Sequence, residues 1–178
     1  TALSGRNEPV EFMRDHLLPA VTAVVKENDG RDTFYYGNFL RDEGGEGSGW
    51  ITYTHHPRFG GNYRGLCNRL DLLLETYAYI SFDQRVLTTY AFVRETLAYV
   101  AANGAQIVAL LDNCEMPPDE IGVRYRLEAF EDREVEVPTR APYMLEGEPI
   151  SVKVPYIGRF VAEQSVRRPL AYALPAEV

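Results

Sequence analysis

The sequence predicts an α/β portion over residues 1–115, followed by a small all-β domain over residues 116–178. Three observations support this division. Apolar residues recur every three or four positions in residues 10–24 and again after Ser81, which indicates amphipathic helices. From Val123 onward, apolar residues alternate with charged ones at the period of a β-strand. The Pro117-Pro118 pair separates the two patterns, and we take it as the domain boundary.

The first helix is expected to begin near Asn7, to bend or tighten near Pro19 and to end at Gly30. Its apolar stripe comprises Val10, Met13, Leu17, Val21 and Val24. A short strand is expected over residues 33–36. Residues 41–49 are rich in glycine and acidic side chains and are predicted to form a mobile loop.

Residues 55–69 mix proline, glycine and asparagine with aromatic residues, which favours a structured binding loop. Residues 70–74 are too short and too uniformly apolar for a helix, so they are predicted to form a central, buried strand. Ser81 then begins a long helix that ends at residues 103–104, and Gln84 completes a capping box. The predicted buried stripe of this helix comprises Val86, Tyr90, Val93, Leu97 and Val100.

Composition narrows the range of partners. No apolar run approaches the ~20 residues that a membrane helix needs, and 46% hydrophobic with 25% charged residues is ordinary for a globular protein. A net charge of −8 argues against nucleic acid and anionic membrane surfaces, because no cationic patch is available to neutralise phosphates. Cys67 and Cys114 lie far apart and form no CxxC motif, so both are expected to be free thiols.

Glu75 is the first candidate for chemistry because it directly follows the apolar run of residues 72–74. Burying an ionised carboxylate without partners costs several kcal/mol, which leaves two interpretations open. In one, Glu75 is exposed at a loop and pairs with Arg69 or Arg85. In the other, it lies at the carboxyl edge of an α/β sheet, where such sheets place their active sites.

Familiar catalytic and metal-binding motifs are absent from the sequence. There is no HExxH or HxxE pair, no GxSxG motif and no glycine-rich phosphate loop with its lysine. His16 is expected on a helix surface. His55 and His56 would point to different sides of an extended chain, so joint chelation by this pair is not expected.

Residues 57–69 (PRFGGNYRGLCNR), 74–79 (LETYAY) and 82–86 (FDQRV) resemble the carboxypeptidase A-like zinc metallocarboxypeptidases, in particular a bacterial branch with PRFGTNYxGLRNR. Residues 12–19 and 167–176 are also similar, so the resemblance extends over most of the chain. It implies the C-terminal part of a mixed-sheet zinc carboxypeptidase-like domain, followed by the β-rich domain. The chain begins at Thr1 without methionine, which fits a trimmed or processed piece.

The family hydrolyses C-terminal peptide bonds with a zinc held by an HxxE pair and a later histidine. The resemblance implies that Glu75 is the general base for a peptide substrate. It also implies that the zinc ligands belong to a missing N-terminal part of the catalytic domain, which would be the second partner. The chain alone is therefore expected to be inactive and to hold no tightly bound zinc.

The segment also supplies candidates for substrate binding: Tyr63, Asn62, Arg58, Arg64 and Arg69. A tyrosine on a glycine-flanked loop can close over a bound peptide end, although Tyr63 could instead pack under the loop. For each arginine the alternative is a structural or surface ion pair.

Two departures from the family pattern are Cys67 in place of arginine and Gly61 in place of threonine. A second functional class also stays open: a non-catalytic peptide- or glycan-binding module that keeps the fold without the metal. An HxxE pair and a later histidine in the upstream coding sequence would discriminate between the two.

Overall fold

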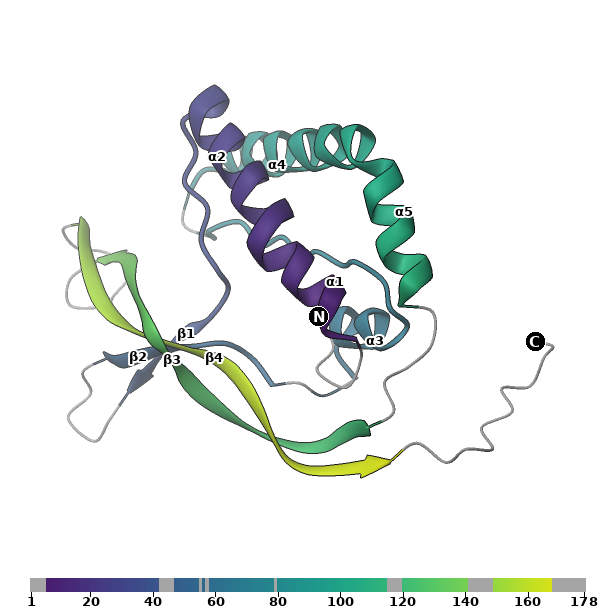
Figure 1. Cartoon of the computed structure of the whole chain (residues 1–178). Coiled ribbons are helices and arrows are strands. Elements are labelled where there is room, and N and C mark those ends of the chain that lie inside the picture. The colour runs from purple at the N-terminus through teal and green to yellow at the C-terminus, as the bar shows by residue number, and fades with distance from the viewer. Residues whose placement is uncertain are drawn as a thin grey trace.

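The protein is described by a computed structural model that covers residues 6–41, 47–54, 56, 58–78, 80–114, 120–140 and 149–167 (Figure 1). The fold is mixed α/β with a mixed sheet, as predicted at this level. In chain order the elements are α1 (Asn7–Phe12), the π-helical turn η1 (Met13–Leu17), α2 (Leu18–Asp29), β1 (Asn38–Arg41), β2 (Gly47–Ile51), α3 (Gly60–Leu66), α4 (Phe82–Ala102), α5 (Gly104–Asn113), β3 (Glu120–Arg140) and β4 (Pro149–Arg167). In Figure 1 the helices form the upper part and the long β3–β4 hairpin runs below them.

The first three elements, α1, η1 and α2, form one continuous helical rod, which confirms the predicted first helix. The π turn lies just before Pro19, where the missing amide N–H and the ring disturb regular α-helical hydrogen bonding. In a π turn each hydrogen bond joins residues five apart instead of four, so the helix is wider here and not tighter. Gly30 ends α2 in the left-handed conformation, with φ of 65°, and donates its N–H to the carbonyl of Lys26 at 3.0 Å.

The helical core forms where this rod meets α4 and α5. Leu17, Val21 and Val25 are at most 2% exposed, and their four-residue spacing begins in the π turn. That register brings Val25 into the core in place of the predicted Val24. The buried cluster comprises Phe12, Met13, Leu17, Val21, Val25, Phe92 and Ile107.

Helix α4 lies where the sequence predicts a long helix, but its predicted buried stripe is wrong. Val86, Tyr90, Val93, Leu97 and Val100 are all exposed, between 37% and 64%. The buried face carries Ala91 and Phe92 instead. Because α4 is apolar on two faces, hydrophobic periodicity alone does not identify the one that packs.

The predicted capping box at the start of α4 is also not formed. The Ser81 side chain makes no capping hydrogen bond to the described helix. The Gln84 carboxamide donates to Asp83 Oδ2 at 3.1 Å instead. A hydrogen bond from the Ser81 side chain, followed by that from Gln84, lowers the pKa of Asp83.

The four strands form one mixed sheet in the order β1-β2-β4-β3. Strands β3 and β4 are antiparallel, as are β1 and β2, while β2 pairs in parallel with β4 and places Trp50 opposite Tyr156. The period-two prediction for the second half is therefore confirmed. The Pro117-Pro118 boundary lies outside the described residues, and the sheet takes strands from both sides of it.

Four further predictions for the first half need correction. The strand expected over residues 33–36 begins only at Asn38, and Gly47 to Gly49 of the expected loop belong to β2, while residues 42–46 lie outside the description. The binding loop expected at residues 55–69 contains the short helix α3. Residues 70–74 are extended but pair with no described strand, so the predicted central strand is wrong for this chain as described. No described helix is long and apolar enough to cross a membrane.

Candidate functional site

The candidate segment runs from α3 through a tight turn into the extended residues 69–77 and then into α4 (Figure 1). Asn68 makes the turn with φ of 53°, a left-handed conformation that asparagine tolerates. Its carboxamide nitrogen donates to the backbone carbonyl of Cys114 at the end of α5. This bond holds the start of the extended segment against the helical half.

Glu75 is exposed on this segment. The side chains of Leu72 and Leu74 pack against the helical core, whereas Leu73 is 64% and Tyr77 52% exposed. Glu75 therefore lies on the outward side together with Leu73 and Tyr77, as the two-residue period of an extended chain requires.

Within the described part of the chain, Glu75 forms no hydrogen bond or ion pair. Arg85, one of its two predicted partners, donates from Nε to the Thr76 hydroxyl at 3.2 Å instead. The other, Arg69, has an exposed side chain that also lacks a partner among the described residues. The pairing that one of the two interpretations expects is thus not formed among the described residues, and the Glu75 carboxylate is exposed to solvent.

Asn62 and Tyr63 are neighbours on α3 but differ in accessibility. Asn62 is 4% exposed, and its Nδ2 donates to the carbonyls of Thr54 at 3.0 Å and His56 at 3.1 Å. These hydrogen bonds hold the preceding loop against α3, so the Asn62 carboxamide has a structural role. Tyr63 is 60% exposed and does not pack under the loop.

Arg64 and Arg58 both have intramolecular contacts. Arg64 binds the Asp71 carboxylate through Nε and Nη2, at 2.6 Å and 3.1 Å. This hydrogen bonding raises the pKa of Arg64. Arg58 stacks its guanidinium 5.0 Å from the centre of the Phe59 ring. Arg64 therefore forms the structural ion pair that was the alternative to substrate binding. The Arg69 side chain is exposed and is available to bind an anion.

Tyr36, Tyr53 and Phe59 form an aromatic cluster next to α3, which the sequence motifs do not predict. Ring centres are 5.8 Å apart for Tyr36 and Tyr53 and 5.4 Å apart for Tyr53 and Phe59. Burial, followed by the negative charge of Asp71, raises the pKa of Tyr53. The sequence feature that could have indicated this cluster is the repeated occurrence of aromatic residues over 34–36, 50–53 and 59.

The described residues contain no group of three or more histidine, cysteine or acidic side chains that could hold a metal ion. His16 is exposed on η1, as predicted, with its ring centre 5.7 Å from that of Phe12. His56 is exposed, and His55 lies outside the described residues. The side chains that are described do not by themselves fit a catalytic zinc, which needs three protein ligands.

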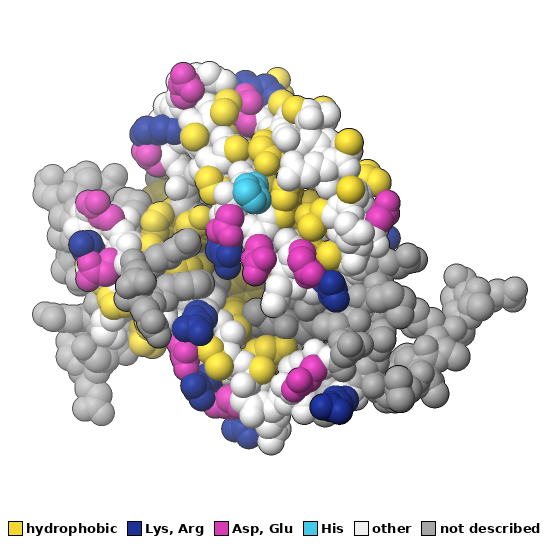
Figure 2. All heavy atoms as spheres, in the orientation of Figure 1, with side chains coloured by type: hydrophobic (Ala, Val, Ile, Leu, Met, Phe, Trp, Pro, Cys, Tyr) yellow, Lys and Arg dark blue, Asp and Glu magenta, His cyan; other side chains and the backbone are white. Residues whose placement is uncertain are grey.

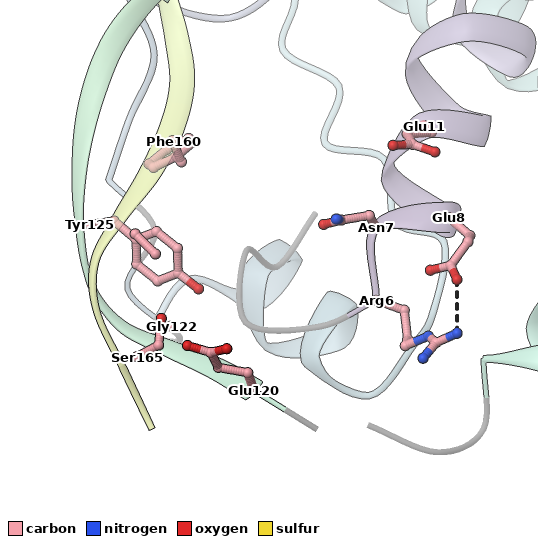
Figure 3. Close-up of a pocket in the computed structure, with 10 residues that line it drawn as sticks. Arg6, Asn7, Glu8, Glu11, Glu120, Gly122, Tyr125, Phe160 and Ser165 are labelled. Carbon is pink, nitrogen blue, oxygen red and sulfur yellow. Dashed lines mark hydrogen bonds and ion pairs between the residues drawn. The ribbon is translucent and has the colours of Figure 1, made fainter. Parts of the chain in front are cut away.

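A pocket of about 760 Å³ opens between the start of α1 and the β3–β4 hairpin (Figure 3). Asn7, Glu8 and Glu11 lie on its helical side, and Glu120 and Tyr125 on its strand side. Arg6 pairs with Glu8 at 2.8 Å. The lining residues are Arg6, Asn7, Glu8, Glu11, Glu120, Gly122, Tyr125, Phe160, Ala162 and Ser165. None of the predicted site residues lines this pocket.

Both cysteines are free thiols, as predicted: Cys67 is exposed at the end of α3, and Cys114 is buried at the end of α5. No protein-family model, curated protein or solved structure matches the chain. The carboxypeptidase hypothesis therefore depends on the residues 57–86 quoted above and on the chemistry that their arrangement permits.

Proposed function

We propose that this chain is the C-terminal part of a zinc-dependent carboxypeptidase and that it contributes the general base Glu75. The observation that carries the proposal is the state of the Glu75 carboxylate: exposed on the outward side of the extended segment and unengaged by described residues. Water solvates an exposed carboxylate, so Glu75 needs no partner within the fold and stays accessible to a substrate. The unengaged carboxylate is consistent with a chemical role.

In this role a carboxylate oxygen of Glu75 accepts a proton from the attacking water and then delivers it to the nitrogen of the departing amine. The exposed Tyr63 offers an amphipathic ring that can cover the end of a bound peptide. Arg69 offers an unengaged guanidinium with the fork geometry that matches a carboxylate. These three residues lie on α3 and the segment that follows it.

A catalytic zinc supplies Lewis-acid chemistry when bound. Because the described residues of this chain do not fit zinc alone, we assign its ligands to the N-terminal part of the catalytic domain that the resemblance implies. No contact between Glu75 and a metal is assumed.

The test is Glu75→Gln in the protein translated from the complete coding sequence. Glutamine keeps the shape of the side chain but cannot accept the proton, so turnover of peptides with free C-termini should fall by about 10²- to 10⁴-fold. The thermal midpoint should stay within about 2 °C, because an exposed side chain without partners contributes little to stability. Glu27→Gln, the same change at an exposed position of α2, should alter neither quantity. Full activity in the Glu75 variant would disprove the catalytic role.

The second candidate is a peptide- or glycan-binding module without catalysis. The aromatic cluster of Tyr36, Tyr53 and Phe59 favours it, because aromatic faces stack on sugar rings and on apolar peptide side chains. This alternative predicts binding that survives Glu75→Gln, with no turnover in the wild type. An upstream sequence without an HxxE pair and a later histidine would also favour it.

A further inference from the structure

Helix α4 carries an apolar stripe on the side that faces away from the helical core. The members of this α4 stripe are between 37% and 64% exposed, and they are Val86, Tyr90, Val93, Leu97 and Val100. At 3.6 residues per turn they fall within about 80° of the helix circumference. The side that packs in the core, with Ala91 and Phe92, lies roughly opposite. The helix therefore has two apolar sides, and the described chain covers one of them.

The spacing of the α4 stripe is that of a coiled-coil seam. Its successive members are separated by four, three, four and three residues, so an apolar side chain recurs every 3.5 residues on average. A stripe restricted to these heptad positions is narrower than the side by which a helix usually packs onto a globular core. The pattern therefore favours a second helix, lying lengthwise against α4, as the group that covers the stripe.

The five positions of the α4 stripe carry no charge, and the nearest cation is already paired. Arg94 Nη2 lies 2.6 Å from Asp29 Oδ2 and 2.7 Å from Glu95 Oε1. Its guanidinium carbon is 5.7 Å from the centre of the Tyr90 ring. Covering the stripe therefore does not strip water from an uncompensated charge, which would be costly.

The stripe is also accessible. Helix α4 lies along the edge of the helical half that is remote from the β3–β4 hairpin (Figure 1). Phe82 and Leu87 border the stripe and are 78% and 48% exposed. Figure 2 shows hydrophobic side chains spread over the helical half on the viewed face as well. Contiguous exposed apolar surface of this kind marks an interaction site.

We propose that the α4 stripe is the interface of a homodimer, in which the stripe of one copy packs along the stripe of a second copy. A second copy of this chain supplies a helix of the same length, with the same heptad spacing and no charge in its seam. In a two-fold dimer the same surface is used on both subunits, and two uncharged heptad stripes satisfy that requirement. The two-fold axis passes near Val93, the middle member of the stripe. Peptidase activity is not needed for this contact.

The size of the contact predicts a weak dimer. Helix α4 has 21 residues, which gives it a length of about 31 Å. The exposed parts of the stripe, Phe82 and Leu87 amount to on the order of 1,000 Å² for the two copies together. This area is at the lower limit of specific interfaces between proteins. The expected dissociation constant is therefore micromolar, because little binding free energy is left after the loss of translational and rotational freedom.

Sedimentation equilibrium of the 178-residue chain, over a concentration series that brackets the micromolar range, tests the dimer. The wild type should show a reversible equilibrium between monomer and dimer. Val93→Glu places two carboxylates near the two-fold axis and should raise the dissociation constant by at least about 100-fold. Val108→Glu, the same change at a 58% exposed position of α5 outside the stripe, is the matched control and should leave the dissociation constant unchanged.

Three results would overturn the homodimer: a wild type that stays monomeric over the whole series, a dimer that persists in Val93→Glu, or equal weakening by Val93→Glu and Val108→Glu. The thermal midpoint, measured at a concentration where the wild type is monomeric, shows that each variant folds. It should stay within about 2 °C of the wild type, because both substituted side chains are exposed in the monomer.

Charge reversal locates the two-fold axis. Val93→Lys alone should be as monomeric as Val93→Glu, since two ammonium groups then face each other. An equimolar mixture of the two variants should associate at least about 10-fold more tightly than either variant alone, because opposite charges meet across the axis. A mixture that associates no more tightly than its components would overturn the placement of Val93 at the axis. Sedimentation reports mass and not turnover, so failure of the dimer and failure of the proposed function are separate outcomes.

Discussion

Arg64 and Asp71 form a two-point ion pair across the turn between α3 and the extended segment, with Nε 2.6 Å from Oδ1 and Nη2 3.1 Å from Oδ2. The Asp71 side chain is 14% exposed and that of Arg64 55%. The planar guanidinium matches the carboxylate at both oxygens. The pair thus joins the helix that carries Tyr63 to the segment that carries Glu75.

Gly61 lies directly against this ion pair. A Cβ atom built at Gly61 would be 2.9 Å from Asp71 Oδ2, closer than real Cβ contacts allow. Replacing glycine by alanine in a helix normally raises the free energy of unfolding by roughly 0.4–1 kcal/mol. Gly104 on α5 has open space around it, so alanine fits there. We therefore expect Gly104→Ala to stabilise the chain by about this amount and Gly61→Ala to gain nothing, because the Asp71 carboxylate must move away from Arg64. Chemical denaturation measures both, and an equal gain at the two positions would contradict the close approach.

The same contact bears on residue 61, where the carboxypeptidase pattern that this segment resembles usually has threonine. Threonine is larger than alanine and β-branched, so it would also displace the Asp71 carboxylate. The Arg64–Asp71 ion pair therefore requires a residue without a side chain at position 61, and this chain has glycine there. Spacing in the sequence does not reveal this contact.

Local patterns in the sequence were sufficient for the elements that depend on local interactions. The first helix and α4 follow from apolar periodicity, and the β3–β4 hairpin follows from alternation. Which face of α4 is buried was not predictable, because both faces are apolar and the choice depends on the packing of α2. Residues 70–74 have the composition of a strand, but strand pairing requires a neighbouring chain that composition does not supply.

In the candidate site, too, features that depend on local sequence were predictable and those that depend on tertiary contacts were not. Exposure of Glu75 follows from its place after an apolar run. The engagement of Asn62 by the fold was missed, and an ion pair of Arg64 was only one of two open alternatives, because a carboxamide or a guanidinium binds a backbone carbonyl or a carboxylate of its own chain as readily as a ligand. Only the geometry distinguishes these uses.

Asn62 is predicted to be a structural residue. Asn62→Ala removes two hydrogen bonds to the carbonyls of Thr54 and His56 and should cost about 1–3 kcal/mol of the free energy of unfolding. Asn62→Asp should cost more, because it places a carboxylate against two carbonyl oxygens in a position that is 4% exposed. Urea denaturation of both variants checks the order. A loss of peptide binding without any loss of stability would instead support the predicted substrate contact.

Tyr53 gives the chain a predicted sensitivity to alkaline pH. Burial and the charge of Asp71 raise its pKa above the ordinary value of 10.0, so the folded state holds the phenolic proton more tightly than the unfolded state. The associated stability is fully present below pH 10.0 and is lost as the pH rises through the raised pKa of the folded state. Tyr53→Phe should therefore lose less stability than the wild type in this alkaline range.

Thermal unfolding as a function of pH measures this difference, and the ultraviolet absorbance of tyrosinate follows the deprotonation. Tyr63→Phe removes a hydroxyl from a ring that is 60% exposed and serves as the control for losing one tyrosine. If Tyr53→Phe and the wild type lose stability in parallel above pH 10.0, Tyr53 is not the group responsible.

The last prediction concerns the two apolar faces of the helical half and compares Leu17 with Leu97. Leu17 is 2% exposed in the core, whereas Leu97 is 64% exposed on the stripe that the sequence predicts to be buried. Leu17→Ala should cost about 2–5 kcal/mol, because it removes buried methyl groups and leaves a cavity. Leu97→Ala in this chain should change the free energy of unfolding by no more than about 0.5 kcal/mol, since the side chain is exposed and alanine also favours the helix. A comparable loss at both positions, measured by urea denaturation of the monomeric chain, would show that the stripe of α4 is buried within the chain itself.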